Sequence, residues 1–373
     1  MIPSTTDSLY DSYVLLRSLT IFVTRYRLVD TVAHHQTVLM MRFRLSCRTL
    51  VSASTFWAGA SVGARPAAFV LKVQRSTMST SLHLHRVGLL QFPVVEDKAT
   101  NHKTAAKYLQ KAADQQVQLA VLPEIWNSPY ATAAFRAYAE ILPDIGATDM
   151  SASPSATLLQ QFATAHKMWI VGGSVPEIDG DKIYNTCLVF DPNGSLVAKH
   201  RKMHLFDIDV PGGIRFKESD TLSPGNTLSA FQCGDFGMVG LGICYDIRFP
   251  EYALLLNEQH KCNLLIYPGA FNLTTGPAHW ELLQRARAVD NQCYVLTASP
   301  ARVPAPEVPG AYPHYTAWGH STVVSPWGDV VATCDASEAL VVTDLDLTKV
   351  EIMRQSIPTM QQKRRDIYTL EGS

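Results

Sequence analysis

The chain lacks the cysteine patterns that build a disulfide framework or a structural zinc site. Its seven cysteines include no C-x-x-C pair, and their number is odd, which argues against both kinds of scaffold. An excess of either charge is also missing, because 32 Lys and Arg face 33 Asp and Glu. This balance gives no reason to expect nucleic acid or an anionic membrane surface as a partner. We therefore expect a small-molecule ligand and a reducing compartment.

Glutamate is absent from the first 95 residues, and this segment differs from the rest of the chain. Its arginines outnumber its three aspartates, and they interrupt each apolar stretch before it reaches the length of a membrane span. Such a composition is typical of a transit peptide, so residues 1–80 are predicted to be a basic extension without a folded core. An upstream start before Met78 is the alternative. The protein is accordingly expected in mitochondria, in the cytoplasm, or in both.

Regular alternation of strand and helix patterns begins at residue 84. Short apolar runs alternate with segments that carry apolar residues at helical spacing, such as 98–115, 154–166 and 277–291. Several β-hairpin patterns close the series after residue 318. This order predicts an α/β fold with two sheets packed face to face and helices on the outer sides, in a single domain over 84–358. Residues 359–373 are expected to form a tail at a dimer interface.

The segment VGLGICYDIRFPE contains the first candidate for chemistry, Cys244. An apolar run with glycines ends at this cysteine, and a helical pattern follows from Glu251. A residue at such a strand-to-helix turn projects from the carboxyl end of the sheet, and the helix N-terminus is expected to lower the pKa of its thiol. Cys244 is therefore a candidate nucleophile, although a buried apolar cysteine is the commoner alternative.

Two further strand ends carry charged residues. Glu124 follows an apolar strand and Pro123, which cannot continue a strand ladder, and Lys202 follows another strand in the basic run KHRKMH. Each feature taken alone is typical of an exposed surface charge. Together with Cys244, however, they predict a single site at the carboxyl edge of the sheets.

These three places resemble, in chain order, the Glu, Lys and Cys motifs of the nitrilase superfamily of carbon–nitrogen hydrolases. The matching strings are LPE, HRKMHLFD and GICYDIRFPE, and the strings NSPY, FDIDVPG and WGHSTVV are similar to the omega-amidase branch. The resemblance covers residues 86–370 and implies an α-β-β-α sandwich, a homodimer and no metal or organic cofactor. The loop 303–314 is longer and richer in proline than the resemblance leads us to expect, and residues 1–80 lie outside it.

The resemblance implies amide hydrolysis through a thioester. Glu124 would act as general base for the thiol, and Cys244 would attack the amide carbonyl. Lys202 would stabilise the oxyanion together with the backbone N–H of Tyr245. Glu218 matches a second glutamate that lies near the lysine and positions the base or the substrate, and an ordinary loop carboxylate is its alternative.

Omega-amidases act on short dicarboxylate monoamides such as 2-oxoglutaramate and 2-oxosuccinamate, so the resemblance implies a cation for the distal carboxylate. Arg248 follows the nucleophile on the same turn, and its guanidinium matches a carboxylate bidentately. A salt bridge with Asp246 or Glu251 is its structural alternative. Thr274 could add a hydroxyl group, and Tyr130 could form a wall of the pocket.

Three other functions stay open at this point. Another amidase of the superfamily, such as one acting on deaminated glutathione, would differ in pocket size. A papain-like hydrolase would need a histidine beside Cys244 and would leave Glu124 and Lys202 unexplained, whereas a non-enzymatic scaffold would be free to lose one of the three. Four aromatic residues near the motifs are expected in the packed core rather than as ligands: His200, His204, His279 and Trp280.

Overall fold

The computed structural model describes residues 84–372, so the predictions made for residues 1–80 and for a start at Met78 lie outside the described residues. The strands are β1 (Leu84–Gln91), β2 (Leu119–Val121), β3 (Trp169–Val171), β4 (Val175–Asp179), β5 (Lys182–Phe190), β6 (Leu196–Arg201), β7 (Asp207–Asp209), β8 (Arg215–Lys217), β9 (Ser229–Gln232), β10 (Met238–Leu241), β11 (Leu264–Pro268), β12 (Tyr294–Ala298), β13 (Thr322–Val324), β14 (Val330–Thr333) and β15 (Ala339–Asp346). The helices are α2 (Lys98–Asp114), α3 (Thr132–Tyr138), α4 (Pro154–His166), α5 (Pro250–His260), α6 (Gly276–Asn291) and α7 (Thr348–Ser356), with 3-10 turns η1 (Glu218–Asp220), η2 (Gly234–Phe236) and η3 (Cys244–Arg248).

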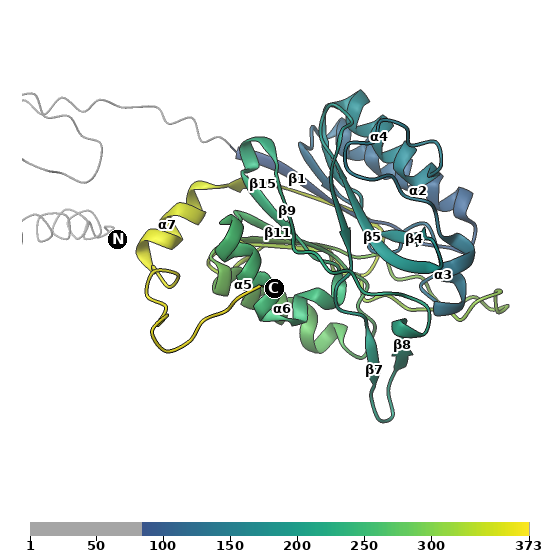
Figure 1. Cartoon of the computed structure of the whole chain (residues 1–373). Coiled ribbons are helices and arrows are strands. Elements are labelled where there is room, and N and C mark those ends of the chain that lie inside the picture. Colours follow the sequence, from purple (N-terminus) through teal and green to yellow (C-terminus); the bar gives the residue numbers. More distant parts are fainter. Residues whose placement is uncertain (1–83, 373) are drawn as a thin grey trace, which may run out of the picture. The chain divides into compact units, whose positions relative to one another are not determined.

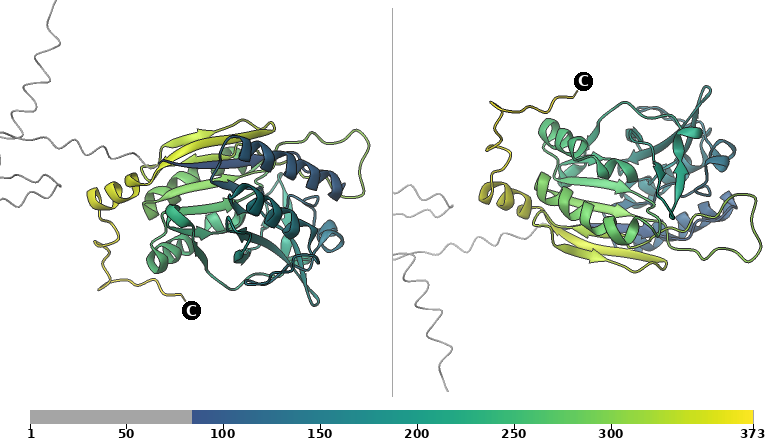
Figure 2. Two further views of the ribbon diagram at one scale, coloured as in Figure 1. Left: turned by 90° about the horizontal axis from the view of Figure 1, so that it is seen from above. Right: turned by 90° about the horizontal axis from the view of Figure 1, so that it is seen from below.

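Two mixed sheets form the centre of the described domain. The first has the strand order β15-β1-β2-β3-β5-β4 with β6 paired to β5, and the second has the order β14-β13-β12-β11-β10-β9. Helices α2 and α4 lie on the outer side of the first sheet, and α5 and α6 lie on the outer side of the second (Figures 1 and 2). The expected four-layer α-β-β-α sandwich is thereby confirmed.

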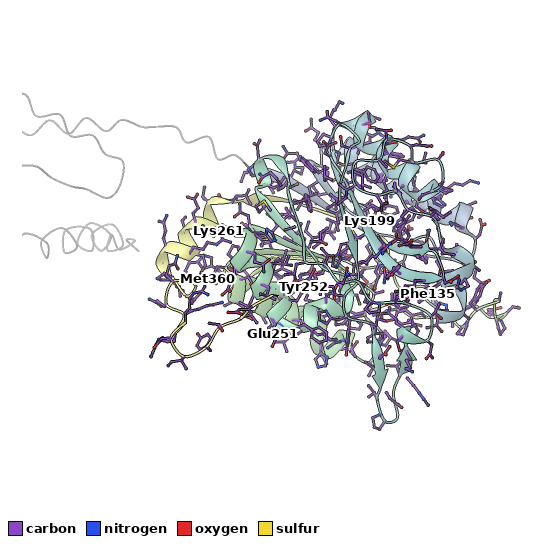
Figure 3. The ribbon with its side chains drawn as sticks, viewed as in Figure 1. Phe135, Lys199, Glu251, Tyr252, Lys261 and Met360 are labelled. Carbon is purple, nitrogen blue, oxygen red and sulfur yellow. The ribbon has the colours of Figure 1, made fainter. Side chains whose placement is uncertain are left out.

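Alternate residues of the central strands supply different layers of the core. Val87 and Leu89 of β1 point between the sheets and join one apolar cluster with Leu241 of β10. Leu90 of the same strand points the other way and joins a second cluster with Leu109 of α2. Strands buried on both faces need apolar residues at every position, which is why these segments read as continuous hydrophobic runs. Side chains fill the space between the layers throughout (Figure 3).

The helix boundaries follow local chain chemistry. Helix α4 has the predicted bounds, because Ser153 accepts the N–H of Ala156 as an N-cap and Lys167 ends the helix in the left-handed conformation. Helix α3 is short. Helix α3 ends at Tyr138 because the next residues are extended, and the N–H of Glu140 donates to the carbonyl of Pro176 beside β4.

The end of the described chain runs back along α5. Lys363 Nζ lies 2.6 Å from Glu258 Oε1, which attaches the predicted tail to this helix. Within residues 84–372, no helix is long and apolar enough to cross a membrane. The same part of the chain contains no cluster of three or more His, Cys, Asp and Glu side chains that could hold a metal ion.

Candidate active site

Cys244 lies at a sharp turn where β10 has ended and η3 begins. Its φ of 47° lies in the left-handed region, which residues with a side chain rarely adopt. Gly242 precedes it at a point of close approach, because an added Cβ would stand 2.5 Å from Cε1 of Tyr267. The predicted turn is therefore present, but a short 3-10 turn begins at Cys244, and helix α5 begins only at Pro250.

Asp246 fixes the conformation of this turn. Its carboxylate accepts the N–H of Ile243 at 2.8 Å and the N–H of His204 at 2.9 Å. The ring nitrogens of His204 and His200 lie 2.7 and 3.3 Å from the same carboxylate. Burial acts to raise the pKa of Asp246, but the hydrogen bonds from the two histidines outweigh it and hold the pKa well below its usual value. The turn that carries Cys244 is thus attached to the end of β6.

The two histidines therefore have a positioning role. His200 is fully buried, as expected, and its other ring nitrogen lies 2.9 Å from Ser229 Oγ. His204 is only half-buried and stacks on Phe249 with 3.7 Å between ring centroids. Both rings hydrogen-bond to Asp246, so a papain-like arrangement of histidine and cysteine has no support in this geometry.

Four buried polar side chains meet beside Cys244. Lys202 Nζ lies 3.0 Å from Glu124 Oε1 and 2.9 Å from Glu218 Oε1. The hydroxyl of Tyr130 donates to Glu218 Oε1 at 2.7 Å and lies 3.2 Å from Glu124 Oε1. Glu124, Lys202 and Glu218 are at most 1% exposed. The structure thus brings together residues that the sequence places after three different strands, β2, β6 and β8.

Backbone and side-chain donors orient the Glu124 carboxylate. The amide of Asn185 donates to Oε1 at 2.9 Å, and the N–H of Ala270 donates to Oε2 at 2.8 Å. The thiol of Cys244 hydrogen-bonds to the same carboxylate. Burial raises the pKa of Glu124 against the opposing charge of Lys202. A carboxylate with a raised pKa that touches the thiol is a suitable acceptor for the thiol proton.

The expectation of a lowered thiol pKa is wrong. Burial first, and the negative charge of Glu124 second, raise the pKa of Cys244 well above its usual value, although Lys202 acts in the opposite direction. Helix α5 begins too far along the chain to supply the expected compensation. The thiol therefore rests protonated, and a base must remove its proton before it can attack.

Lys202 provides positive charge at the same place. Burial acts to lower its pKa, but the charges of Glu124 and Glu218 outweigh this effect and raise the pKa well above its usual value. The side chain is therefore an ammonium group. Tyr245 directly follows Cys244 in η3, and N–H groups in the first turn of a helix have no acceptor within the helix. Both groups are thus available to an oxyanion formed next to the sulfur.

Arg248 lies near this cluster without an acidic partner. Within residues 84–372, no carboxylate forms an ion pair with it, so the salt bridge to Asp246 or Glu251 is absent. Its Nε is buried without a hydrogen-bond partner in the described structure. The guanidinium lies 4.7 Å from the ring centroid of Phe271, and Nη1 lies 3.1 Å from Nδ1 of His279. His279 is exposed on α6, so its expected place in the core is wrong, whereas Trp280 is buried as expected.

The other predicted substrate contacts have different environments. Tyr130 is buried and contacts Glu124 and Glu218, and Tyr245 is half-buried with its ring 5.3 Å from that of Phe206. Thr274 lies on the exposed loop before α6, where its N–H donates to Asn272 Oδ1. The side chain of Thr274 lies beside Gly213 in the turn between β7 and β8. A role for Thr274 therefore depends on how this hairpin and the loop meet a substrate.

Sequence reasoning missed Tyr315, which closes one side of the site. Its ring lies 4.6 Å from that of Tyr130, and its hydroxyl donates to the carbonyl of Ala270 at 2.5 Å. Burial, and then the charges of Cys244 and Glu124, raise its pKa well above the usual value. Asn185 was also missed, although a signal existed, because an asparagine inside the apolar strand KIYNTCLVF is conspicuous. No comparable signal marks Tyr315, which follows an irregular loop.

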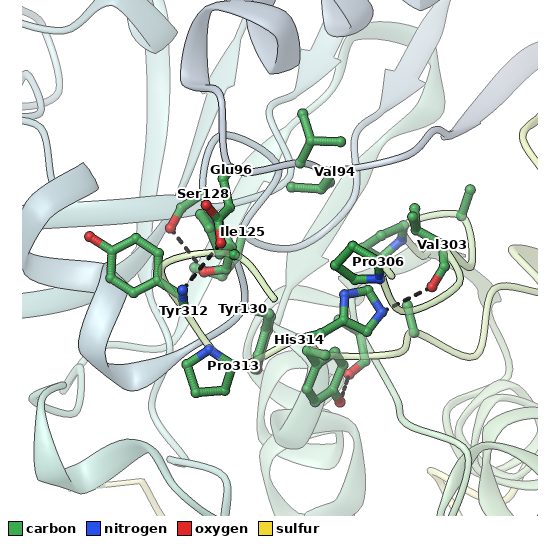
Figure 4. A pocket seen from close by; sticks show the side chains of 18 of the residues that line it. Val94, Glu96, Ile125, Ser128, Tyr130, Val303, Pro306, Tyr312, Pro313 and His314 are labelled. Atoms are coloured by element: carbon green, nitrogen blue, oxygen red, sulfur yellow. Dashed lines mark hydrogen bonds between the residues drawn. The ribbon is translucent and has the colours of Figure 1, made fainter. Parts of the chain in front are cut away.

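A cavity of about 330 Å³ adjoins the cluster on the side of Tyr130 and Tyr315. Glu124 is among the residues that line it. In Figure 4, the loop residues Pro306, Tyr312 and His314 surround this space together with Tyr130.

Comparison with known proteins places this geometry in a family context. The family model for carbon-nitrogen hydrolases matches residues 86–355. Omega-amidase NIT2 of Xenopus tropicalis is 50% identical over 286 residues, which cover 77% of this chain and 97% of that protein. The Bos taurus protein of the same name is 51% identical over 287 residues, covering 77% and 98%. Homo sapiens Omega-amidase NIT2 is 50% identical over 286 residues, covering 77% and 97%.

Solved structures agree with this relationship. Nit3 of Saccharomyces cerevisiae, a member of branch 10 of the nitrilase superfamily, aligns with a TM-score of 0.66 and 41% identity, covering 76% of this chain and 96% of that chain. The NitFhit protein of C. elegans aligns with the same TM-score of 0.66 and 30% identity, covering 77% of this chain and 66% of that chain.

Proposed function

The chain belongs to the carbon–nitrogen hydrolase family, and we propose that it is an omega-amidase for short dicarboxylate monoamides. The substrates would be 2-oxoglutaramate and 2-oxosuccinamate, and the products would be the 2-oxo dicarboxylate and ammonia. The relatives named Omega-amidase NIT2 support the reaction class. The substrate class is supported by the site itself, as follows.

Acylation would begin with the proton of the Cys244 thiol. Glu124 hydrogen-bonds to this thiol and has a raised pKa, so it accepts the proton while the sulfur attacks the amide carbonyl. Negative charge then develops on the carbonyl oxygen, which Lys202 and the N–H of Tyr245 stabilise. Glu124 passes the proton to the amide nitrogen, the C–N bond breaks, and ammonia leaves a thioester on Cys244.

Deacylation would use the same groups in the reverse order. Glu124 takes a proton from a water molecule, and the resulting hydroxide adds to the thioester carbonyl. The C–S bond breaks, the carboxylic acid is released, and the proton returns to the sulfur.

Glu218 would act by holding Lys202 in place, because its Oε1 lies 2.9 Å from Nζ and its Oε2 accepts the N–H of Phe206 at 2.7 Å. Neither carboxylate is free to move away from the lysine.

The observation that carries the substrate proposal is the unpaired cation at Arg248. A half-buried arginine normally has a carboxylate partner, and burial here lowers its pKa, which reflects the missing compensation. The distal carboxylate of a dicarboxylate monoamide would supply that partner in a bidentate pair. Without a substrate, the aromatic rings of Phe271 and Tyr245 hold the guanidinium in place. Its Cζ lies 4.7 Å from the ring centroid of Phe271 and 5.5 Å from that of Tyr245.

A substrate panel tests this proposal. Ammonia release is measured for 2-oxoglutaramate, 2-oxosuccinamate, deaminated glutathione and a short neutral amide such as propionamide. We expect the two dicarboxylate monoamides to be hydrolysed with the highest kcat/KM. Arg248→Met should raise KM for them by about 100-fold while affecting propionamide far less, and Arg248→Lys should recover only part of the loss. A preference for deaminated glutathione, or equal losses on charged and neutral amides, would contradict the proposal.

A homodimer is the proposed assembly. Apolar side chains are exposed on α6 and on the turn before β14, where Leu282 is 63%, Val289 43% and Trp327 45% exposed. Large apolar groups of this kind are commonly covered by a partner subunit. Light scattering measures the mass in solution, and Leu282→Glu should lower it to that of a monomer. A wild-type mass equal to that of one chain would contradict this assembly.

A further inference from the structure

The loop 303–314 and the apolar part of the cavity beneath it have no part in the reaction described above. The carboxylate of Glu96 accepts the N–H groups of Ala311 and Tyr312, both at 3.2 Å, and Nε2 of His314 lies 3.0 Å from the carbonyl oxygen of Val303. Prolines within the loop fix its backbone further. The loop is thus held at both ends, and the cavity of about 330 Å³ is preformed.

The cavity lies on the Glu124 side of the proposed active site, away from Cys244 and Arg248. Its lining includes Glu124, whose carboxylate would transfer the protons. Tyr130, Ala270 and Tyr315, which lie around this carboxylate, line the cavity as well. Neither Cys244 nor Arg248 is among its lining residues. In the proposed reaction the acyl part of the substrate extends from the sulfur toward Arg248. The amide nitrogen must face Glu124, since this residue protonates it, and therefore faces the cavity.

The side chains that line the cavity suit a substituent carried by the amide nitrogen of a substrate. Most of the wall is apolar, with valine and proline side chains such as Val94, Val303 and Pro306, and its lining contains no arginine or lysine that could hold a second carboxylate. The charged groups are the acids Glu96, at the loop, and Glu124. An alkyl group fits such walls, and the released amine is attracted by the acids once it has taken up a further proton from water.

From these observations we infer that the cavity is a leaving-group site that accepts the N-alkyl substituent of secondary omega-amides. The inference rests on the proposed function. The step is balanced in the same way as for ammonia: the Sγ–C bond forms, the C–N bond breaks, and Glu124 transfers the thiol proton to the nitrogen. The leaving group is then a primary alkylamine, and water hydrolyses the thioester. The enzyme is therefore a deacylase of N-alkyl dicarboxylate monoamides as well.

The experiment compares succinamate with N-methyl-, N-propyl- and N-benzylsuccinamate, with released amine measured by derivatisation. Wild-type kcat/KM for N-propylsuccinamate should lie within about tenfold of that for succinamate. Val303→Trp fills the cavity from the loop and should lower the constant for N-propylsuccinamate at least ~10-fold more than that for succinamate. Val95→Trp does the same from a lining residue outside the loop, which is 37% exposed and tolerates a larger side chain. Val331→Trp, 39% exposed on β14 and outside the lining, is the matched control and should change neither constant.

The outcomes separate the two proposals. Hydrolysis of succinamate without release of propylamine overturns the leaving-group site and leaves the omega-amidase function intact. Equal losses on both substrates in Val303→Trp and Val95→Trp also overturn it, because they would indicate general disturbance of the active site. If succinamate itself is not hydrolysed by the wild-type chain, the proposed function fails, and the leaving-group site fails with it.

Discussion

Two buried glutamates of the same sandwich have opposite electrostatic environments. Glu140 is 4% exposed and accepts hydrogen bonds from Asn127 and from both Ser153 and Ser155, and Lys98 Nζ lies 2.8 Å away. Burial acts to raise its pKa, but these donors outweigh burial and lower it. Glu124 is equally buried, yet its pKa is raised.

The difference lies in how the positive charge is distributed. Within the described residues 84–372, Lys98 forms an ion pair with Glu140 alone, whereas Lys202 is shared between Glu124 and Glu218. Two carboxylates with a single ammonium group leave one negative charge without full compensation, and a proton is the simplest way to provide it. A fully satisfied carboxylate stabilises the fold, while an under-compensated one can take up and release protons.

The largest effect is expected at the nucleophile. Cys244→Ala should reduce kcat by at least ~10,000-fold, because no other group can form the thioester. Its melting temperature should stay close to that of the wild type, since only one sulfur atom is removed. Cys187→Ala, at another fully buried cysteine, is the control and should retain activity. Substantial steady-state turnover by Cys244→Ala would exclude the thioester mechanism.

The comparison itself is tested by the same substitution at both glutamates. Glu124→Gln should lower kcat by at least ~100-fold, because the base is lost, with little loss of stability. Glu140→Gln should destabilise the fold by about 2 kcal/mol, because charge-assisted hydrogen bonds are lost, and should leave kcat within about twofold. Urea unfolding and ammonia release are measured on both variants. A large loss of activity in Glu140→Gln at a temperature where it is folded would break the distinction.

Acid should remove the stabilisation of the fold that Glu140 provides. Glu140 has a lowered pKa in the folded chain, so its stabilisation is fully present above its ordinary value of 4.5 and is lost as the pH falls through the folded pKa. The difference in free energy of unfolding between wild type and Glu140→Gln should therefore be largest at pH 7 and shrink below about pH 4.5. Urea titrations from pH 7 to pH 3 measure it. A difference that is independent of pH would contradict the assignment.

The smallest effect is expected at Tyr130. Tyr130→Phe removes the hydroxyl that donates to Glu218 and also contacts Glu124, and one such hydrogen bond corresponds to about a fivefold change in kcat/KM. Tyr108→Phe is the matched control, because its hydroxyl donates to Glu338 on the structural side of the domain. Equal kcat/KM values for Tyr130→Phe and the wild type would show that the hydroxyl does not position the cluster.

Much of this site could be predicted from the sequence, because each main residue follows a strand. Glu124, Lys202 and Cys244 stand where apolar runs end. Strands β2 and β6 belong to one sheet and β10 belongs to the other, and the face-to-face packing of the sheets brings these ends together. The pKa of Cys244 could not be predicted in this way, since it depends on burial by segments distant in the chain. The place of Tyr315 was missed because it follows an irregular loop, for which no periodic pattern exists. His279 lies in the first turn of the predicted helix α6, on its exposed side, so its side chain does not reach the core.

The protonated state of Cys244 has a chemical consequence for the durability of the enzyme. Peroxide and general alkylating reagents attack thiolates, and their rate depends on exposure. Cys244 is 4% exposed, and its raised pKa keeps the sulfur neutral in the resting site. Hydrogen peroxide and iodoacetamide should therefore inactivate the resting enzyme slowly. An electrophile that resembles the substrate and binds between Arg248 and Glu124 should inactivate it fast. In the proposed mechanism, Glu124 would take the thiol proton while the sulfur attacks this electrophile.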